Sequence, residues 1–114
     1  MIIFNYDCCC RSKEGNKISG GIPTEIGNVK SLIRLDISNC SLNGTIPTEL
    51  GSLNNLKDLD FSSNKMNSSI PEEFYTMSLE VLQLDNNFLQ GTISSSFSNM
   101  STLQVLKLGK HIDW

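Results

Sequence analysis

The sequence lacks the features that usually mark an enzyme, a metalloprotein, a membrane-spanning protein or a nucleic-acid-binding protein. It has a single histidine, and its four cysteines include no CxxC pair, so we expect no metal site and no catalytic constellation. It has no run of about 20 apolar residues, the length that a helix needs to cross a bilayer. Its formal net charge of −3 gives no basic field that would attract nucleic acid. These shortages favour a binding or structural role without a cofactor.

What the sequence does have is an internal repeat. Successive copies begin at Leu32, Leu56, Leu79 and Leu103, so the spacings are 24, 23 and 24 residues. Repeats of this length that begin LxxLxL are typical of a solenoid, in which each coil contacts its neighbours. The composition, with 39% hydrophobic and 18% charged residues, agrees with one folded domain.

The copies agree column by column. The strand columns are apolar, at Leu32, Leu35, Ile37, Leu56, Leu59, Phe61, Leu79, Leu82, Leu84, Leu103, Leu106 and Leu108. The column after the strand holds Cys40, Asn64, Asn87 and His111. A later column holds isoleucine followed by proline, at residues 22–23, 46–47 and 70–71. In the copy that begins at Leu79, Ser94–Ser96 replace the proline turn, and we expect them to cap a short helix that ends at Phe97.

These columns predict the shape of one coil. Apolar residues two apart point the same way from an extended segment, so each coil gives one short strand to a parallel sheet. The asparagine turns the chain, because its amide both donates to and accepts from backbone groups. The Ile-Pro step forces an extended segment along the opposite wall. We therefore predict an α/β repeat solenoid with short parallel β-strands on the concave face and irregular or 3-10 segments on the convex face.

The repeat pattern also predicts how the chain is divided. Residues 1–15 form an irregular N-terminal segment, and the repeat domain spans residues 16–114. Its parts are a half repeat at 16–31, full repeats at 32–55, 56–78 and 79–102, and a partial repeat at 103–114.

We expect both ends of the array to be imperfect. Cys8, Arg11 and Lys13 fall in the buried strand columns, and burying a charge is costly, so we expect the first strand to begin at Leu32. Neither end shows a cap, and an uncapped coil exposes the apolar face that a neighbour would cover. The chain is therefore expected to be marginally stable or to self-associate through its ends.

The segment Cys40–Gly51, with the sequence CSLNGTIPTELG, and its copies resemble the plant-specific class of leucine-rich repeat. The Gly-x-Ile-Pro step that distinguishes this class stands at residues 20–23 and 44–47. Ser68 replaces its glycine in the third instance of the step, at residues 68–71. The resemblance implies an extracellular segment of a plant receptor-like kinase, a receptor-like protein or a secreted inhibitor of the polygalacturonase-inhibiting kind. It also implies that the partner is a peptide or protein ligand, or a co-receptor.

The chain departs from that family's pattern in several places. Cys8, Cys9 and Cys10 do not match its cysteine-paired N-terminal cap, and no signal peptide or C-terminal cysteine pair is found. The kinase signatures, a glycine-rich loop with His-Arg-Asp and Asp-Phe-Gly, are missing, so we expect no kinase activity from these residues. Three interpretations stay open: a receptor or inhibitor module, a truncated product of a receptor-like serine/threonine kinase gene, and a small cytosolic scaffold.

The outward residues of the predicted strands form the candidate ligand site. Neighbouring strands lie about 5 Å apart, so residues in one column touch. Four aspartates would give an acidic patch suited to a basic or polar peptide, with a cationic residue at each edge. The full set is Arg34, Asp36, Asp58, Asp60, Gln83, Asp85 and Lys107. The alternative is that these aspartates form only a solvated face.

The cysteines and the sequons each allow two interpretations. Cys40 fits its column as a small buried thiol, or it forms a disulfide with one of Cys8–Cys10 in an oxidising compartment. His111 lies three coils from Cys40, too far for a shared metal ion. Of four N-x-Ser/Thr sequons, Asn39 is a poor candidate for glycosylation, and the better ones are Asn43, Asn67 and Asn99. Such sequons also arise from composition alone.

Overall fold

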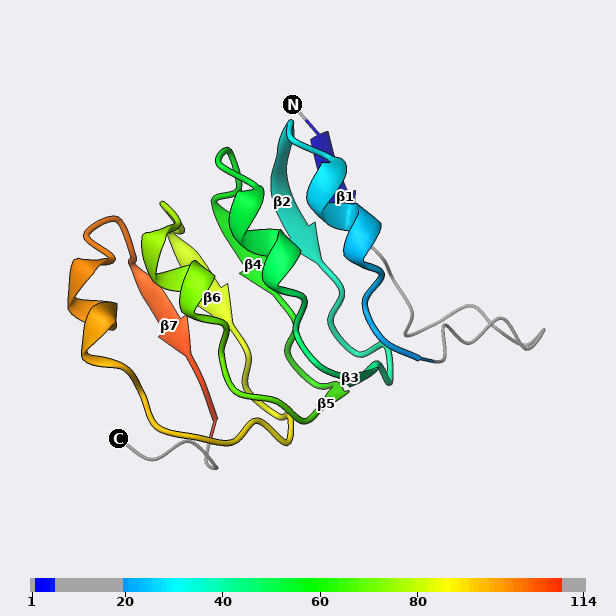
Figure 1. The fold of residues 1–114 in the computed structure, drawn as a ribbon. Coiled ribbons are helices and arrows are strands. Elements are labelled where there is room, and N and C mark those ends of the chain that lie inside the picture. The colour runs from blue at the N-terminus through cyan, green and yellow to red at the C-terminus, as the bar shows by residue number, and fades with distance from the viewer. Residues whose placement is uncertain (1, 6–19, 110–114) are drawn as a thin grey trace.

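The computed structural model describes residues 20–109 in full and residues 2–5 by their backbone. The coils stack side by side, as Figure 1 shows, and each contributes a strand to a five-stranded parallel sheet in the order β1-β2-β4-β6-β7. These strands are β1 (Ile2–Asn5), β2 (Leu32–Asp36), β4 (Asp58–Asp60), β6 (Val81–Gln83) and β7 (Val105–Lys107). A second, two-stranded parallel sheet consists of β3 (Asn43–Gly44) and β5 (Lys65–Met66).

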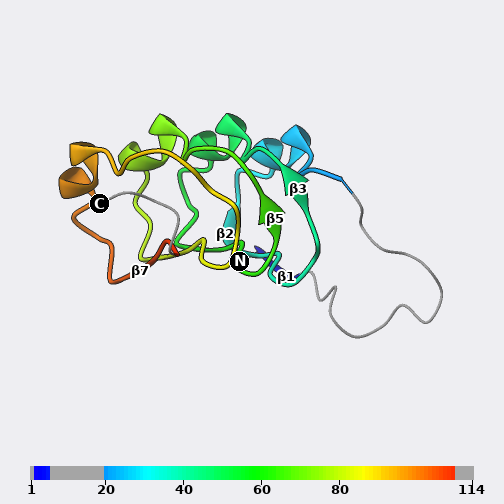
Figure 2. The same ribbon diagram turned by 90° about the horizontal axis from the view of Figure 1, so that it is seen from below.

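Within the described residues, four 3-10 helices form a row on the side of the solenoid opposite the five-stranded sheet (Figure 2). They are η1 (Thr24–Asn28), η2 (Thr48–Ser52), η3 (Glu72–Thr76) and η4 (Ser95–Asn99). Proline precedes the first three, where its fixed φ and missing N–H do not disturb the helix. Ser94 precedes η4, and its side chain accepts a 3.1 Å hydrogen bond from the Ser96 N–H. The predicted serine cap is therefore confirmed, although the helix ends at Asn99 rather than at Phe97.

The core lies between the sheet and the row of helices and is built from the predicted apolar columns. Every strand-column residue from Leu32 to Leu84 is buried, and Leu108 is buried as well. Leu103 and Leu106 are half-buried, because β7 is the outermost strand of the sheet. Burying one such side chain contributes about 1.5–3 kcal/mol to folding. The predicted solenoid, with parallel strands on one side and 3-10 segments on the other, is confirmed.

The asparagine column joins neighbouring coils as the pattern indicated. The buried Asn64 side chain accepts hydrogen bonds from the N–H groups of Cys40 and Leu42, both at 3.0 Å. Its amide donates to the carbonyl of Ile37 at 2.8 Å and to that of Phe61 at 2.9 Å. Three of these four partners belong to the preceding coil. One side chain therefore satisfies buried backbone groups of two coils that no sheet hydrogen bond could reach.

The expectation that the first strand begins at Leu32 is wrong. β1 precedes β2 and pairs with it in parallel, with Ile3 opposite Arg34 and Asn5 opposite Asp36. The short apolar segment at the N-terminus supplies this strand, although its spacing from the next strand does not match the repeat period. The rest of the expected irregular segment and the boundary at residue 16 lie outside the described residues, so the division of the chain stays a prediction.

The structure decides between the two interpretations of Cys40, and it shows that Val29 is more exposed than its column predicts. Cys40 is buried, as predicted for its column, but it is disulfide-bonded, so the disulfide alternative applies rather than the free thiol. Cys8, Cys9 and Cys10 lie outside the described residues. Val29 belongs to the column that closes each coil, yet it is 38% exposed, whereas Leu53 in the next coil is fully buried. In the described part of the chain η1 is the first helix of the row, so no preceding helix covers Val29.

Candidate functional site

The predicted ligand residues lie on the outer face of the five-stranded sheet, which we call the sheet face. The strand register aligns Arg34 with Asp58, and Asp58 with Val81 and then Val105. The second column aligns Asp36, Asp60, Gln83 and Lys107. These are the predicted columns, and their role in ligand binding stays a prediction. Alternation along each strand explains them, because the buried leucines and these polar residues point to opposite faces.

Two aspartates of the second column bind the backbone of their own strand ends. One oxygen of Asp36 accepts hydrogen bonds from the N–H and the hydroxyl of Ser38, at 3.1 and 2.8 Å. One oxygen of Asp60 accepts from the Ser62 N–H at 2.9 Å. Both are Asx-type contacts, in which a side chain binds a backbone group two residues on. Part of the acidic column therefore stabilises the end of each strand, and each carboxylate keeps its second oxygen for another partner.

The second oxygens already have weak partners on the sheet face. The second oxygen of Asp60 accepts from the Gln83 amide across the strands at 3.3 Å. The second oxygen of Asp36 lies 3.8 Å from the guanidinium of Arg34, whose side chain is 49% exposed. An exposed ion pair of this length contributes little to stability, because water competes for both groups. A ligand can therefore replace either contact at little cost.

Asp85 is less well satisfied than the other aspartates. One of its oxygens accepts from the Asn86 amide at 3.3 Å, while the other is buried and has no hydrogen-bond partner among the described residues. It follows β6 and lies beside Gly109, where an added Cβ would stand 3.4 Å from the Asp85 Cα. Asp85 is thus at the end of the sheet face, beyond the aligned strand residues.

The structure brings some of the predicted residues together and keeps others apart. Asp36, Asp58, Asp60 and Gln83 occupy adjacent positions on β2, β4 and β6. Arg34 lies beside this group, whereas Lys107 stands on the exposed edge strand and is aligned with Gln83. Three strand spacings, or about 14 Å, separate β2, which carries Arg34, from β7, which carries Lys107. The sheet face is therefore an acidic centre with one cation at each side.

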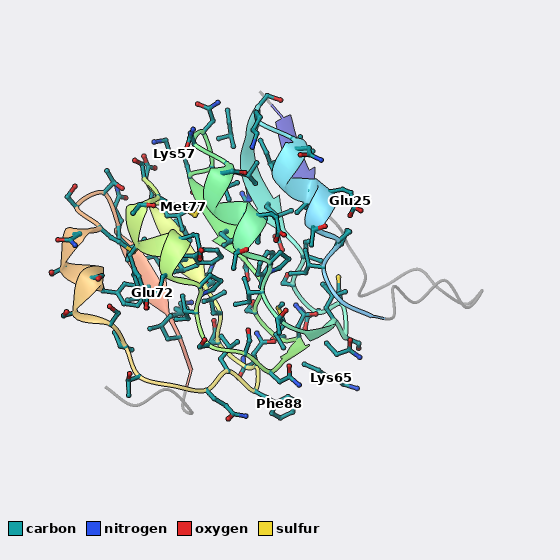
Figure 3. The ribbon with its side chains drawn as sticks, viewed as in Figure 1. Glu25, Lys57, Lys65, Glu72, Met77 and Phe88 are labelled. Carbon is teal, nitrogen blue, oxygen red and sulfur yellow. The ribbon has the colours of Figure 1, made fainter. Side chains whose placement is uncertain are left out.

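A cavity on the opposite side of the solenoid was missed by the sequence analysis. It has a volume of about 410 Å³ and lies between η3 and η4, with Glu72 and Tyr75 on one side and Ser96 and Asn99 on the other. Figure 3 labels Glu72 and Met77, which line it from the third coil. Tyr75 is buried, and its ring meets that of Phe97 edge-on with 4.8 Å between the centroids.

The sequence signal for this cavity is a broken glycine column. Gly27 and Gly51 let neighbouring helices pack tightly: an added Cβ on Gly27 would lie 2.6 Å from the carbonyl oxygen of Glu49, and one on Gly51 would collide with Glu73. The next repeat, at residues 56–78, has Tyr75 at the corresponding position. A phenol ring cannot fit where a methyl group already collides, so η4 stands away from η3. The substitution can be read in the aligned repeats without a structure.

The described residues offer no metal centre or membrane-spanning helix. Within residues 2–5 and 20–109, no three histidine, cysteine, aspartate or glutamate side chains are grouped as metal ligands would be. No helix in that part of the chain is long and apolar enough to cross a bilayer. His111 lies outside it. Asn43, Asn67 and Asn99 are all exposed, so a glycosylating enzyme could reach each of them, as it could Asn39.

Comparison with known proteins gives one family and many structural matches. The family model for the Leucine Rich Repeat matches residues 31–53, 55–77 and 78–100. The structure is similar to that of the plant peptide hormone receptor RGFR1 in complex with RGF2, with a TM-score of 0.80, 38% identity, and coverage of 82% of this chain and 15% of that one. No curated protein sequence gives a significant match.

Two further solved structures show the range of proteins with this fold. The Arabidopsis receptor kinase HAESA, in complex with the peptide hormone IDA and the co-receptor SERK1, is 33% identical with a TM-score of 0.79, covering 82% of this chain and 16% of that one. A plant ice-binding protein is 34% identical with a TM-score of 0.75, covering 82% of this chain and 30% of that one. The chain thus spans less than a third of the length of these three proteins.

Proposed function

Because this chain belongs to the leucine-rich repeat family, we propose that it is a protein- or peptide-binding module from the extracellular part of a plant cell-surface receptor. In this role it would take part in ligand perception and signalling. The observation that carries the proposal is the sheet face, where aligned carboxylates on the adjacent strands β2 and β4 lie between two exposed cations. We assign no catalytic activity to these residues. Any kinase activity would belong to a longer parent protein.

The fold alone does not decide between functions, since a receptor and an ice-binding protein are both similar to this chain. The chemistry of the sheet face favours a peptide. About 14 Å separates the strands of Arg34 and Lys107, the length of about four extended residues. The carboxylates between them suit a basic or hydrogen-bonding segment, because their second oxygens have only weak partners. Two similar receptors are recorded with peptide hormones or a co-receptor, which supports the same partner classes here.

A phage-displayed library of random 12-residue peptides tests the proposal. We expect selection on the wild-type chain to enrich peptides with lysine or arginine, and their binding to be lost in the double variant Asp58→Lys/Asp60→Lys. The matched control is Glu25→Lys/Glu49→Lys, which makes the same charge change at exposed positions on η1 and η2. Enriched peptides that bind both double variants equally would show that the sheet face is not the site.

The extracellular location is a proposal of its own. The disulfide at Cys40 supports it, because disulfides persist in oxidising compartments such as the cell exterior. The exposed sequons support it as well, and we propose Asn43, Asn67 and Asn99 as glycosylation sites. Peptide mass spectrometry of the chain secreted from plant cells would detect the glycans, and three unmodified asparagines would contradict this location. Self-association through the ends stays a prediction, to be tested by light scattering.

A further inference from the structure

The cavity between η3 and η4 is a built feature of the fold rather than a surface irregularity. It exists because Tyr75 stands where Gly27 and Gly51 stand in the preceding coils. The repeat 56–78 is also one residue shorter than the repeat before it. Its chain is extended at Met77, with a ψ of 153°, whereas ψ is 80° at Leu53, the corresponding residue of the preceding repeat. This difference also shapes the cavity. Its volume of about 410 Å³ falls within the range of about 300–1,000 Å³ that is typical of small-molecule sites.

The lining offers hydrogen-bonding groups that the protein itself does not use. Within the described part of the chain, the side chains of Ser78, Ser96 and Asn99 make no hydrogen bond, and all three line the cavity. Thr76 and Thr102 donate their hydroxyl hydrogens to the carbonyls of Glu73 and Leu79, at 3.0 and 2.8 Å. The two threonines therefore offer acceptors only, whereas the other three side chains offer donors as well.

The charge of the lining excludes one large class of ligands. Glu72 is its single ionisable carboxylate, and neither lysine nor arginine lines the cavity. A phosphate, sulfate or carboxylate ligand would therefore meet like charge without a cation to balance it. Tyr75 and Met77, which are 6% and 7% exposed, supply the apolar part of the lining. A neutral molecule with adjacent hydroxyl groups and an apolar face fits this combination.

We propose that this cavity binds a neutral sugar residue. Its ring hydroxyls would bind Ser78 and Ser96, and its C–H face would lie against Tyr75; a free sugar would also bind the Asn99 amide. Two sources of the sugar fit the geometry: a free saccharide, or the first N-acetylglucosamine of a glycan on Asn99. The second source arises because Asn99 and Ser101, two residues of one sequon, both line the cavity. The site is separate from the sheet face, so it does not depend on the proposed peptide ligand.

The first experiment uses the oxidised chain produced without glycans and labelled with nitrogen-15. It is titrated with N-acetylglucosamine while backbone amide shifts are recorded. We expect saturable shifts at residues 76–78 and 96–102, with a dissociation constant in the low millimolar range. Ser78→Trp, which fills the cavity, should weaken binding about tenfold or more. Asn54→Trp places the same ring at the exposed, corresponding position of the preceding coil and should bind as the wild type does.

The second experiment separates the two sources. The chain is secreted from yeast cells that attach N-glycans, and its titration is compared with that of the unglycosylated chain. If the attached glycan fills the cavity, the secreted chain no longer binds added sugar, whereas the unglycosylated chain still does. If a free saccharide is the ligand, both bind. The proposal is overturned if the unglycosylated chain gives no saturable shifts at these residues, or if Ser78→Trp binds as tightly as Asn54→Trp. Failure of the peptide selection on the sheet face would leave this result unaffected.

Discussion

The repeats 56–78 and 79–102 are in register along the sheet but stand apart along the helices. β4 and β6 pair residue for residue, with Leu59 opposite Leu82, as β6 and β7 do. On the other side, an open cavity lies between η3 and η4, whereas η1, η2 and η3 pack against one another through glycine. Backbone hydrogen bonds set the spacing on the sheet side. On the helix side, the size of one side chain sets it, so a single substitution opens a cavity without disturbing the sheet.

The asparagine column belongs to the regular part of the structure. Replacing one of its asparagines gives the largest expected loss of stability. In Asn64→Ala, the N–H groups of Cys40 and Leu42 and the carbonyl of Ile37 lose a buried partner. Each unsatisfied buried group costs about 1–3 kcal/mol, so we expect the free energy of unfolding to fall by about 3–5 kcal/mol. Urea denaturation measures it.

Asn87→Ala is the matched comparison for that change. The Asn87 side chain is half-buried and accepts from a single N–H, that of Met66 at 3.0 Å. We expect it to cost less than Asn64→Ala by about 1 kcal/mol or more. Equal losses in the two variants would mean that the buried backbone groups near Asn64 find other partners.

Copying Tyr75 into the preceding coil should remove the difference between the two helix pairs. In Gly51→Tyr, the new side chain collides with Glu73 and pushes η3 away from η2. Overpacking of this kind costs about 1–3 kcal/mol, and we expect a loss near the upper end. Urea denaturation is the measurement, and Asn54→Tyr, at an exposed position three residues on, is the control. A Gly51→Tyr chain as stable as this control would show that glycine does not set the helix spacing.

The repeat period predicted the sheet side of the structure better than the helix side. The apolar and polar columns of the strands follow from alternation alone, which is why Asp36 and Asp60 lie side by side as expected. The local contact of each carboxylate with a serine could not be read from the period, because it depends on the conformation of the strand end. β1 was missed because its sequence does not follow the repeat. The cavity was missed because it depends on an exception in the repeat, Tyr75 in the glycine column, and not on the agreement between the copies.

On the sheet face, the two acidic columns should respond differently to truncation. Asp60→Ala removes the contacts with the Ser62 N–H and the Gln83 amide, so we expect the free energy of unfolding to fall by about 1 kcal/mol. Asp58 makes no hydrogen bond or ion pair with any described residue, and Asp58→Ala should stay within about 0.5 kcal/mol of the wild type. Thermal unfolding of both variants checks the pair. A larger loss in Asp58→Ala would mean that the first column carries the structural role.

The last expected effect depends on pH and concerns Tyr75, which lines the cavity from η3. Burial raises the pKa of Tyr75 above its usual 10.0, a backbone hydrogen bond from Ser94 lowers it, and the charge of Glu72 raises it. The folded chain therefore holds the phenol proton more tightly than the unfolded chain does. The stabilisation is complete below pH 10 and is lost as the pH rises through the folded-state pKa. Tyr75→Phe keeps the ring contact with Phe97 and should change stability by about 1 kcal/mol or less at pH 7.

Above pH 10 the wild type and Tyr75→Phe should diverge. The wild type loses stability as the buried phenol is forced to ionise, whereas the phenylalanine variant has no proton to lose at that position. All other ionisable groups are the same in the two chains, so the difference between the two curves isolates Tyr75. Urea denaturation at pH 8, 10 and 11 measures this difference. Parallel curves would mean that water reaches the phenol of Tyr75. The side chain would then be less buried than its packing against Phe97 indicates.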